Sequence, residues 1–242
     1  MSEIERYMAP NDLSAAVEVL ASGGVTILAG GTDLTPQVKD GKRAYEATLM
    51  NIRKVAELGR ISLENHEVRI GTLVTVSEIR YNDLIGEAAP VLCEAAAHFA
   101  SEQIRNAATI GGNICNASPA GDMIIPLLVL GAEVELASWN AGTMKVRREP
   151  LEHFFTGPGR TTRRENELLT AVVFKQPSPD FVGKFRKSGP RPALEISTVT
   201  VGIGGDYKDG KLSNVRVALG AVGPTPMRAK ATEAALEGKI LN

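Results

Sequence analysis

The sequence of 242 residues contains only two cysteines, three histidines and one tryptophan, and aromatic residues make up 5% of it. Two cysteines are too few for a disulfide scaffold, and an ordinary iron–sulfur cluster needs about four thiolates. The histidines, at positions 66, 98 and 153, do not have the spacing of a metal site. We therefore expect no metal or iron–sulfur cluster to be ligated by this chain.

An excess of charge of one sign is also absent. Lys and Arg total 27 and Asp and Glu total 28, so the formal net charge is -1. A charge near zero gives no general attraction to nucleic acid or to a membrane surface. No run of about 18 apolar residues occurs, so no membrane span is expected. Without an apolar signal core near the first residues, the reducing cytoplasm is the expected compartment.

The composition itself, 43% hydrophobic and 23% charged, is that of an ordinary globular protein. Residues 12–52 predict a helix, a strand, a glycine loop, a short helix and a second strand. The first helix begins with the capping residues of NDLSAAVEVLA and ends at Gly23-Gly24. The two strands are VTILA and ATLMNI.

The middle of the chain alternates between β-rich and helical patterns. We expect strand structure over 68–79, a long helix over 86–100, a helix and then a strand over 122–138, and a strand over 167–174. Pro126 is expected in the first turn of its helix, where proline is tolerated.

A linker signal, QPSPD, occurs at 176–180, where two prolines stand among polar residues. Beyond it, ISTVTVGIGGDY and LSNVRVALGAVG flank KDGK, a pattern typical of a β-hairpin. The alanine-rich TPMRAKATEAALEGK predicts a helix capped near Thr225. The last part of the chain is therefore expected to be a small α+β unit.

Two glycine loops carry the strongest functional signal, LAGGTDLTP at 28–36 and TIGGNICNASPAGD at 109–122. Glycine accepts positive φ angles and close approach of a ligand, and successive free N–H groups can bind an anion. We expect the amides of both Gly-Gly pairs to reach one phosphate-containing ligand. Asp33 would repel phosphate, so it is expected to cap the next helix or to accept hydrogen bonds from loop amides.

Each Gly-Gly pair, taken alone, could instead be a tight turn. Neither loop has the G-x-G-x-x-G of a Rossmann fold or the G-x-x-x-x-G-K-[ST] of a P-loop. GIGGD at 202–206 lies inside a β-rich run and is interpreted as structural.

Taken together, LAGGTDL, QIRNAATIGGNICNASPAGD and FRKSGPRPALEIS…VRVALGAVGPTPMRA resemble the flavin-binding, or medium, subunit of the molybdenum hydroxylases. This is the family of carbon monoxide dehydrogenase and xanthine dehydrogenase. The resemblance implies an α+β fold: a PCMH-type FAD-binding domain of two subdomains, then a small C-terminal α+β domain with an antiparallel sheet. The expected limits are 1–175, divided into about 1–55 and 56–175, and 176–242.

The resemblance also implies which residues contact FAD: Ala29, Gly30, Gly31, Thr32, Asp33, Leu34, Phe99, Thr109, Ile110, Gly111, Gly112, Asn113, Asp122, Leu168 and Lys187. In this family Asp122 would bind ribose hydroxyls on the adenosine side. Without the resemblance, Asp122 is more simply a helix cap and Phe99 a core residue. Lys187 belongs to the basic cluster KFRKSGPR, which suits a solvated face, a partner subunit or a phosphate.

The function that the resemblance implies is electron transfer, because a flavin accepts electrons singly and releases them as a pair. Electrons would come from two [2Fe–2S] clusters on a small partner subunit and leave to an external acceptor. A large partner subunit with a molybdenum–pterin cofactor would oxidise the substrate. Catalytic residues and metal ligands would then lie on the partners of a heterotrimer, and none on this chain.

Two other functions stay open on the residues alone. A self-contained FAD-dependent oxidoreductase would need an acid or base over the flavin, and the three histidines, none of them in either loop, are its candidates. A nucleotide-binding or assembly module without a redox role would bind the ADP half of the cofactor and show no flavin spectrum.

Overall fold

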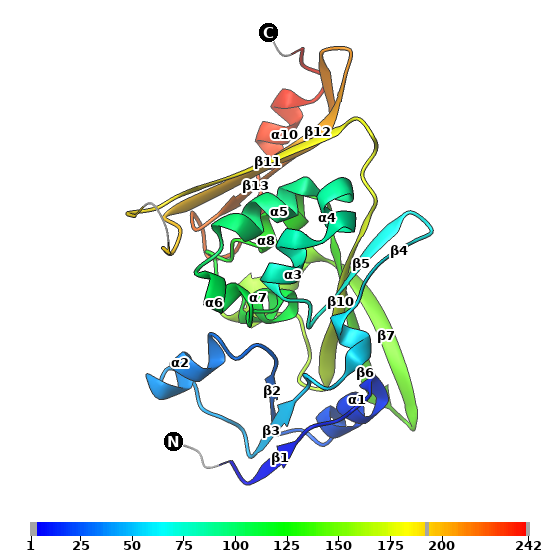
Figure 1. Ribbon diagram of the computed structural model, residues 1–242, viewed down its shortest axis with the longest axis vertical. Coiled ribbons are helices and arrows are strands. Elements are labelled where there is room, and N and C mark those ends of the chain that lie inside the picture. Colours follow the sequence, from blue (N-terminus) through cyan, green and yellow to red (C-terminus); the bar gives the residue numbers. More distant parts are fainter. Residues whose placement is uncertain (1–3, 192–193, 241–242) are drawn as a thin grey trace.

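The computed structural model describes residues 4–191 and 194–240. It has an α+β fold in which a small N-terminal sheet and a C-terminal sheet lie at opposite ends, with a helical layer between them (Figure 1). The helices are α1 (Leu13–Ala21), α2 (Leu34–Lys39), the 3-10 helix η1 (Ala56–Gly59), α3 (Val76–Tyr81), α4 (Asp83–Ala88), α5 (Pro90–His98), α6 (Glu102–Arg105), α7 (Ile110–Asn116), α8 (Ile124–Val129), α9 (Leu151–Phe154) and α10 (Lys230–Leu236). The strands are β1 (Arg6–Met8), β2 (Val25–Leu28), β3 (Thr48–Asn51), β4 (Ile61–Glu64), β5 (Glu67–Gly71), β6 (Glu133–Asn140), β7 (Thr143–Pro150), β8 (Phe155–Gly157), β9 (Arg160–Thr161), β10 (Glu167–Lys175), β11 (Phe181–Ser188), β12 (Val199–Lys208), β13 (Lys211–Gly220) and β14 (Met227–Arg228).

The N-terminal sheet is parallel, in the order β1-β3-β2. Helix α1 connects β1 to β2, and its N-cap Asp12 accepts a hydrogen bond from the backbone N–H of Ala15 at 2.8 Å. The helix buries Leu20 in a hydrophobic cluster with Met50 of β3 and Leu168 of β10. This cluster joins the N-terminal sheet to the second sheet.

The second sheet is antiparallel, in the order β4-β5-β10-β6-β7. Its central strand β10 is buried along almost its whole length, as the apolar run in its sequence predicts. Val172 of β10 pairs with Ile70 on one side and with Val134 on the other. Helix α7 packs on β5 and β10, and α8, which is buried throughout, lies within the largest hydrophobic cluster.

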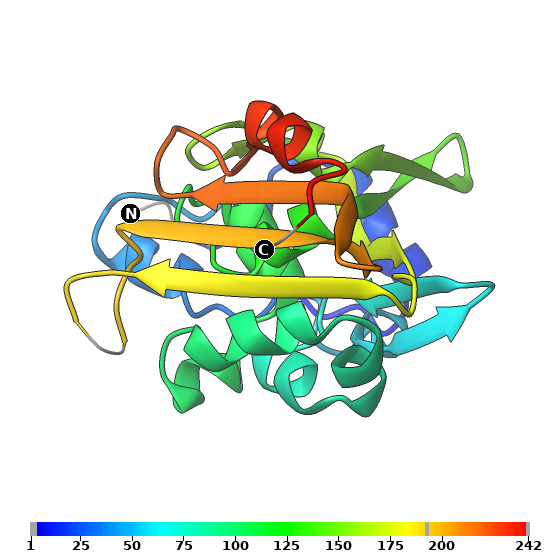
Figure 2. The ribbon, with the colours of Figure 1, turned by 90° about the horizontal axis from the view of Figure 1, so that it is seen from above.

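The C-terminal sheet is also antiparallel, in the order β11-β12-β13-β14, and its long strands lie across α5 and α8 (Figure 2). Close packing requires two glycines of β12. A Cβ on Gly202 would lie 2.8 Å from Ile125 Cγ2, and one on Gly204 would lie 2.6 Å from Val129 Cγ1. The GIGGD stretch is therefore structural, as predicted, because it lets β12 contact α8.

Most of the predicted elements are confirmed, including the fold class with its C-terminal antiparallel sheet. The first helix, the strands flanking the first glycine loop, the strand over 167–174 and the C-terminal hairpin all form where expected. The hairpin turn is Asp209-Gly210, and both residues have positive φ. Pro126 lies near the start of α8.

Three predicted boundaries are wrong. The β-rich stretch 68–79 ends as a strand at Gly71 and becomes α3, because Thr75 and Glu78 form a capping box that starts a helix. The predicted helix over 86–100 is divided into α4 and α5, since Pro90 begins a new helix. The final helix begins at Lys230, well after Thr225, and has no side-chain cap.

Strands β7 and β11 were not predicted. Both carry several charged side chains and lack a continuous apolar face, so no period-2 apolar signal marks them.

No helix in the described part of the chain is long and apolar enough to cross a membrane.

Candidate functional site

The two glycine loops meet in the folded chain, although about 80 residues separate them. Gly30 lies directly against the backbone just before the second loop: a Cβ on Gly30 would overlap the carbonyl oxygen of Ala107 and lie 3.2 Å from Ala108 Cα. Only glycine allows this approach. The absence of a side chain at Gly30 therefore serves the contact between the loops.

The first loop leaves a row of backbone amides unpaired. Within residues 4–191 and 194–240, the N–H groups of Gly30, Gly31, Thr32 and Asp33 have no hydrogen-bond acceptor. Gly31 has a φ of 74°, a backbone conformation that favours glycine. Successive free amides of this kind form a nest for an anion such as a phosphate.

The second glycine stretch was predicted as a loop, but Gly111 and Gly112 lie in the first turn of α7 (Ile110–Asn116) and have a different role from Gly30 and Gly31. Gly111 packs against Thr72, whose hydroxyl oxygen a Cβ on Gly111 would overlap, and the Gly111 N–H donates to the Thr72 carbonyl at 3.0 Å. The Gly112 N–H donates to the hydroxyl of Thr109, the N-cap of α7, also at 3.0 Å. The expectation that both Gly-Gly pairs present free amides is therefore wrong for the second pair, whose amides already have acceptors.

What the second loop does present is an unpaired acceptor. The side-chain oxygen Oδ1 of Asn113 is buried and accepts no hydrogen bond from any residue that the structure describes. Buried polar atoms are nearly always paired in folded proteins, so an orphaned acceptor calls for a donor from elsewhere. Free amides on one loop and a free acceptor on the other fit a ligand with both a phosphate and hydroxyl groups, as FAD has.

A side-chain bridge ties the two halves of this region together. Gln37 of α2 donates from one nitrogen, Nε2, to Asp33 at 2.8 Å and to Asn116 of α7 at 3.0 Å. Asp33 occupies the N-cap position of α2 but makes no capping hydrogen bond, so its predicted role as a cap is wrong. The Asp33 carboxylate instead helps to orient Gln37, the residue that joins α2 to α7.

Asp122 and Lys187, predicted separately, form one buried ion pair. The Lys187 Nζ lies 2.7 Å from Asp122 Oδ2, and the two side chains are 6% and 7% exposed. Ser197 donates to the other carboxylate oxygen at 2.7 Å, and Lys187 also donates to the Glu195 carbonyl at 2.8 Å. The simpler alternatives are wrong: Met123, not Asp122, is the N-cap residue of α8, and Lys187 is not on a solvated face.

Phe99 and Leu168 lie at different depths. Phe99 follows the end of α5 and is half-buried against the largest cluster. Leu168 is buried in the cluster that Ala29 also packs against, so its side chain supports the start of the first loop from the core side. Arg105 supports the chain before the second loop, since it donates to the carbonyl oxygens of Phe99 and Ala100 at 2.7 and 2.9 Å.

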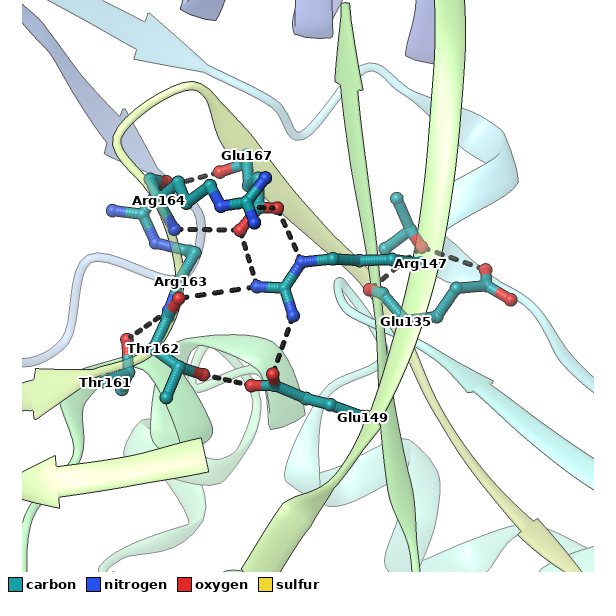
Figure 3. A network of polar contacts seen from close by, with 9 residues as sticks. Glu135, Arg147, Glu149, Thr161, Thr162, Arg163, Arg164 and Glu167 are labelled. Atoms are coloured by element: carbon teal, nitrogen blue, oxygen red, sulfur yellow. Dashed lines mark hydrogen bonds and ion pairs between the residues drawn. The ribbon is translucent and has the colours of Figure 1, made fainter. Parts of the chain in front are cut away.

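A polar network that was not predicted surrounds the start of β10 (Figure 3). Arg147 of β7 donates to both carboxylate oxygens of Glu167, at 2.6 and 2.8 Å, and to Glu149 at 2.6 Å. Burial alone would raise the pKa of Glu167, but hydrogen bonds from Arg147 and from the Arg164 N–H outweigh it and lower that pKa. The network holds the segment 162–164 beside β10. Its members are too far apart in sequence to form a recognisable motif.

The three histidines, candidates for an acid or base over a flavin, lie in three separate parts of the fold. His66 lies in the turn between β4 and β5, His98 at the end of α5 and His153 in α9, and all three are exposed. None of them belongs to either glycine loop.

Two family models together match most of the chain. A family model described as the FAD binding domain in molybdopterin dehydrogenase matches residues 2–176. Another, described as the CO dehydrogenase flavoprotein C-terminal domain, matches residues 184–242.

Individual relatives agree with these matches. The chain is 33% identical to the xanthine dehydrogenase FAD-binding subunit of Escherichia coli O157:H7 over 245 residues, 100% of this chain and 82% of the relative. It is 30% identical to the carbon monoxide dehydrogenase medium chain of Hydrogenophaga pseudoflava over 240 residues, 96% of this chain and 80% of the relative.

Solved structures show the same similarity. Carbon monoxide dehydrogenase from Hydrogenophaga pseudoflava, solved without the Mo-pyranopterin moiety of its cofactor, superposes with a TM-score of 0.93 at 29% identity, covering 100% of this chain and 83% of that chain. Quinoline 2-oxidoreductase from Pseudomonas putida 86 gives a TM-score of 0.89 at 28% identity, covering 98% and 81%.

Proposed function

Because the chain belongs to the family of FAD-binding subunits of the molybdenum hydroxylases, oxidoreductases of the xanthine and carbon monoxide dehydrogenase type, we propose that it holds FAD where its two glycine loops meet. The observation that supports the proposal is the row of unpaired amides from Gly30 to Asp33, whose first residue, Gly30, lies against the backbone just before the second glycine stretch. These amides would bind the pyrophosphate. FAD, when bound, supplies the electron-transfer chemistry.

The remaining proposed contacts with FAD are inferred from the hydrogen-bonding atoms and the space that these residues leave unused. Asn113 would accept a hydrogen bond from a hydroxyl or N–H of FAD through its unpaired Oδ1. Gly112 is exposed and has no Cβ, so a ligand can lie close to its backbone. The full proposed set is Ala29, Gly30, Gly31, Thr32, Asp33, Leu34, Phe99, Thr109, Ile110, Gly111, Gly112, Asn113, Asp122, Leu168 and Lys187.

We further propose that the chain works as the medium subunit of a larger complex. Its partners would be a small subunit with [2Fe–2S] clusters, which delivers electrons, and a large subunit with the molybdenum–pterin cofactor; an external acceptor would take the electrons up. The similarity to medium subunits along the whole chain supports this role.

We also propose the domain limits 1–175, with a division near residue 55, and 176–242. We expect a reducing cytoplasm as the compartment, where free Cys93 and Cys115 would persist.

A ligand titration tests the binding site. The purified chain is titrated in parallel with FAD, FMN and ADP, and flavin fluorescence and the thermal unfolding midpoint are followed. FAD should raise the midpoint most, ADP less, and FMN hardly at all, because only FAD and ADP carry a pyrophosphate. Excess ADP should also displace FAD. Equal stabilisation by FMN and FAD, or no binding of FAD and ADP, would contradict the proposed site.

A further inference from the structure

The Arg53 side chain holds the first glycine loop through hydrogen bonds to two of its carbonyl groups. It lies just after β3, and its guanidinium donates from Nε to the Ala29 carbonyl and from Nη2 to the Gly30 carbonyl, each at 2.7 Å. The planar guanidinium has donors in a fixed fork, so it can hold two consecutive carbonyl groups at once. Nothing in the sequence pattern marks this residue as part of the site.

The geometry of the peptide bond explains how these two hydrogen bonds orient the amides of the loop. In a trans peptide unit the carbonyl and the N–H point in opposite directions. The unit whose carbonyl belongs to Ala29 carries the N–H of Gly30, and the next unit carries the N–H of Gly31. Arg53 therefore fixes both carbonyls on its own side and turns the two unpaired N–H groups away from itself.

Arg53 is itself held in place by the end of β3. Its backbone N–H donates to the side-chain oxygen of Asn51 at 3.0 Å, and the side-chain nitrogen of Asn51 donates to the Tyr7 hydroxyl at 2.9 Å. Arg53 is exposed, so its side chain fills no part of the core. A cationic donor also polarises the peptide units whose oxygens it holds, which makes their N–H groups stronger donors.

We propose that Arg53 is a positioning residue for FAD: by holding the Ala29 and Gly30 carbonyls, it presents the Gly30 and Gly31 amides to the pyrophosphate. This inference rests on the proposed function of the loops. It assigns Arg53 a role in ligand binding that depends on the fork of its guanidinium rather than on its charge alone.

Three variants of the full chain test the proposal: Arg53→Met, Arg53→Lys and the control Lys54→Met. Lys54 is also exposed, and its side chain makes no hydrogen bond or ion pair with any residue that the structure describes, so its replacement removes the same charge one position away. Dissociation constants for FAD and for ADP are measured for each variant, together with the thermal unfolding midpoint without ligand.

Arg53→Met should weaken FAD and ADP by the same factor, about 10- to 100-fold, because two hydrogen bonds that order the loop are lost. Arg53→Lys should recover only part of this loss, since a single ammonium cannot hold both carbonyls as the fork does. Lys54→Met should bind as the wild type does, and all unfolding midpoints should stay close to the wild-type value.

Wild-type affinity in Arg53→Met, or full affinity in Arg53→Lys, would overturn the proposal. A loss confined to FAD, with ADP unaffected, would overturn it as well, because the effect would then not lie at the pyrophosphate. Failure of the wild-type chain to bind FAD and ADP is a separate result that removes the proposed function itself.

Discussion

Lys187 and Asp122 pair with each other inside the protein: their side chains meet at 2.7 Å, and each is less than a tenth exposed. The pair connects β11 of the C-terminal sheet to the segment that leads into α8. The resemblance to the family predicts that both residues contact FAD, yet each already has a strong partner within the chain. Their first role is therefore to join the C-terminal sheet to the rest of the fold.

Replacing one partner of this ion pair should destabilise the chain more than replacing both partners together. Asp122→Asn or Lys187→Met leaves one buried partner uncompensated, and each should lower the free energy of unfolding by about 3–5 kcal/mol. The double variant should lose less than the sum of the two. Urea denaturation measures all three, with Lys184→Met as control, because Lys184 is exposed and its ion pair with Glu94 spans 3.8 Å. Additive losses would contradict a direct interaction.

Gly30→Ala should separate the two glycine loops. The added Cβ would overlap the Ala107 carbonyl, a backbone atom that cannot move aside without shifting the loop. We expect FAD affinity to fall at least about tenfold while the circular dichroism spectrum stays native. Gly86→Ala is the control, because a Cβ on Gly86 meets nothing within 4 Å, and alanine favours its helix. Unchanged affinity in Gly30→Ala would show that the loop contact does not matter for binding.

The Arg147–Glu167 pair predicts a pH-dependent stability. The folded-state pKa of Glu167 is lowered, so the carboxylate contributes stability above its unfolded pKa of about 4.3 and loses it as the pH falls through the folded value. Glu167→Gln should therefore be less stable than the wild type near pH 7, by about 1–3 kcal/mol. The difference should shrink as the pH falls below about 5. A difference that stays constant down to pH 3 in urea titrations would contradict this account.

Local patterns predicted most elements of the chain, whereas the fold class was predicted from the resemblance to the family. The helix at 13–21, the strand at 167–175 and the hairpin at Asp209-Gly210 all follow from short-range signals: a cap, an apolar run and a turn. Strand β7 escaped prediction because its order comes from pairing with β6 and from charged side chains that bond across the sheet.

The candidate site was predicted as a list of residues but not as an arrangement. The Gly-Gly pairs look alike in sequence, and only the fold separates them: Gly30 and Gly31 leave their amides free, whereas Gly111 and Gly112 use theirs within the chain. Arg53 could not be predicted, because it acts through the carbonyls of residues more than 20 positions earlier.

The response of individual backbone amides to ligand shows directly whether the first glycine loop binds the pyrophosphate. The 15N-labelled chain is titrated with ADP and then with FAD, and the amide signals are followed by NMR. Large shifts are expected at Gly30, Gly31, Thr32 and Asp33 with both ligands, because their free N–H groups bind the pyrophosphate. Smaller shifts are expected at Gly111 and Gly112, whose amides already have acceptors. If FAD binds while the NMR signals of the four first-loop amides stay where they are without ligand, the pyrophosphate binds elsewhere. That result would contradict the proposed site.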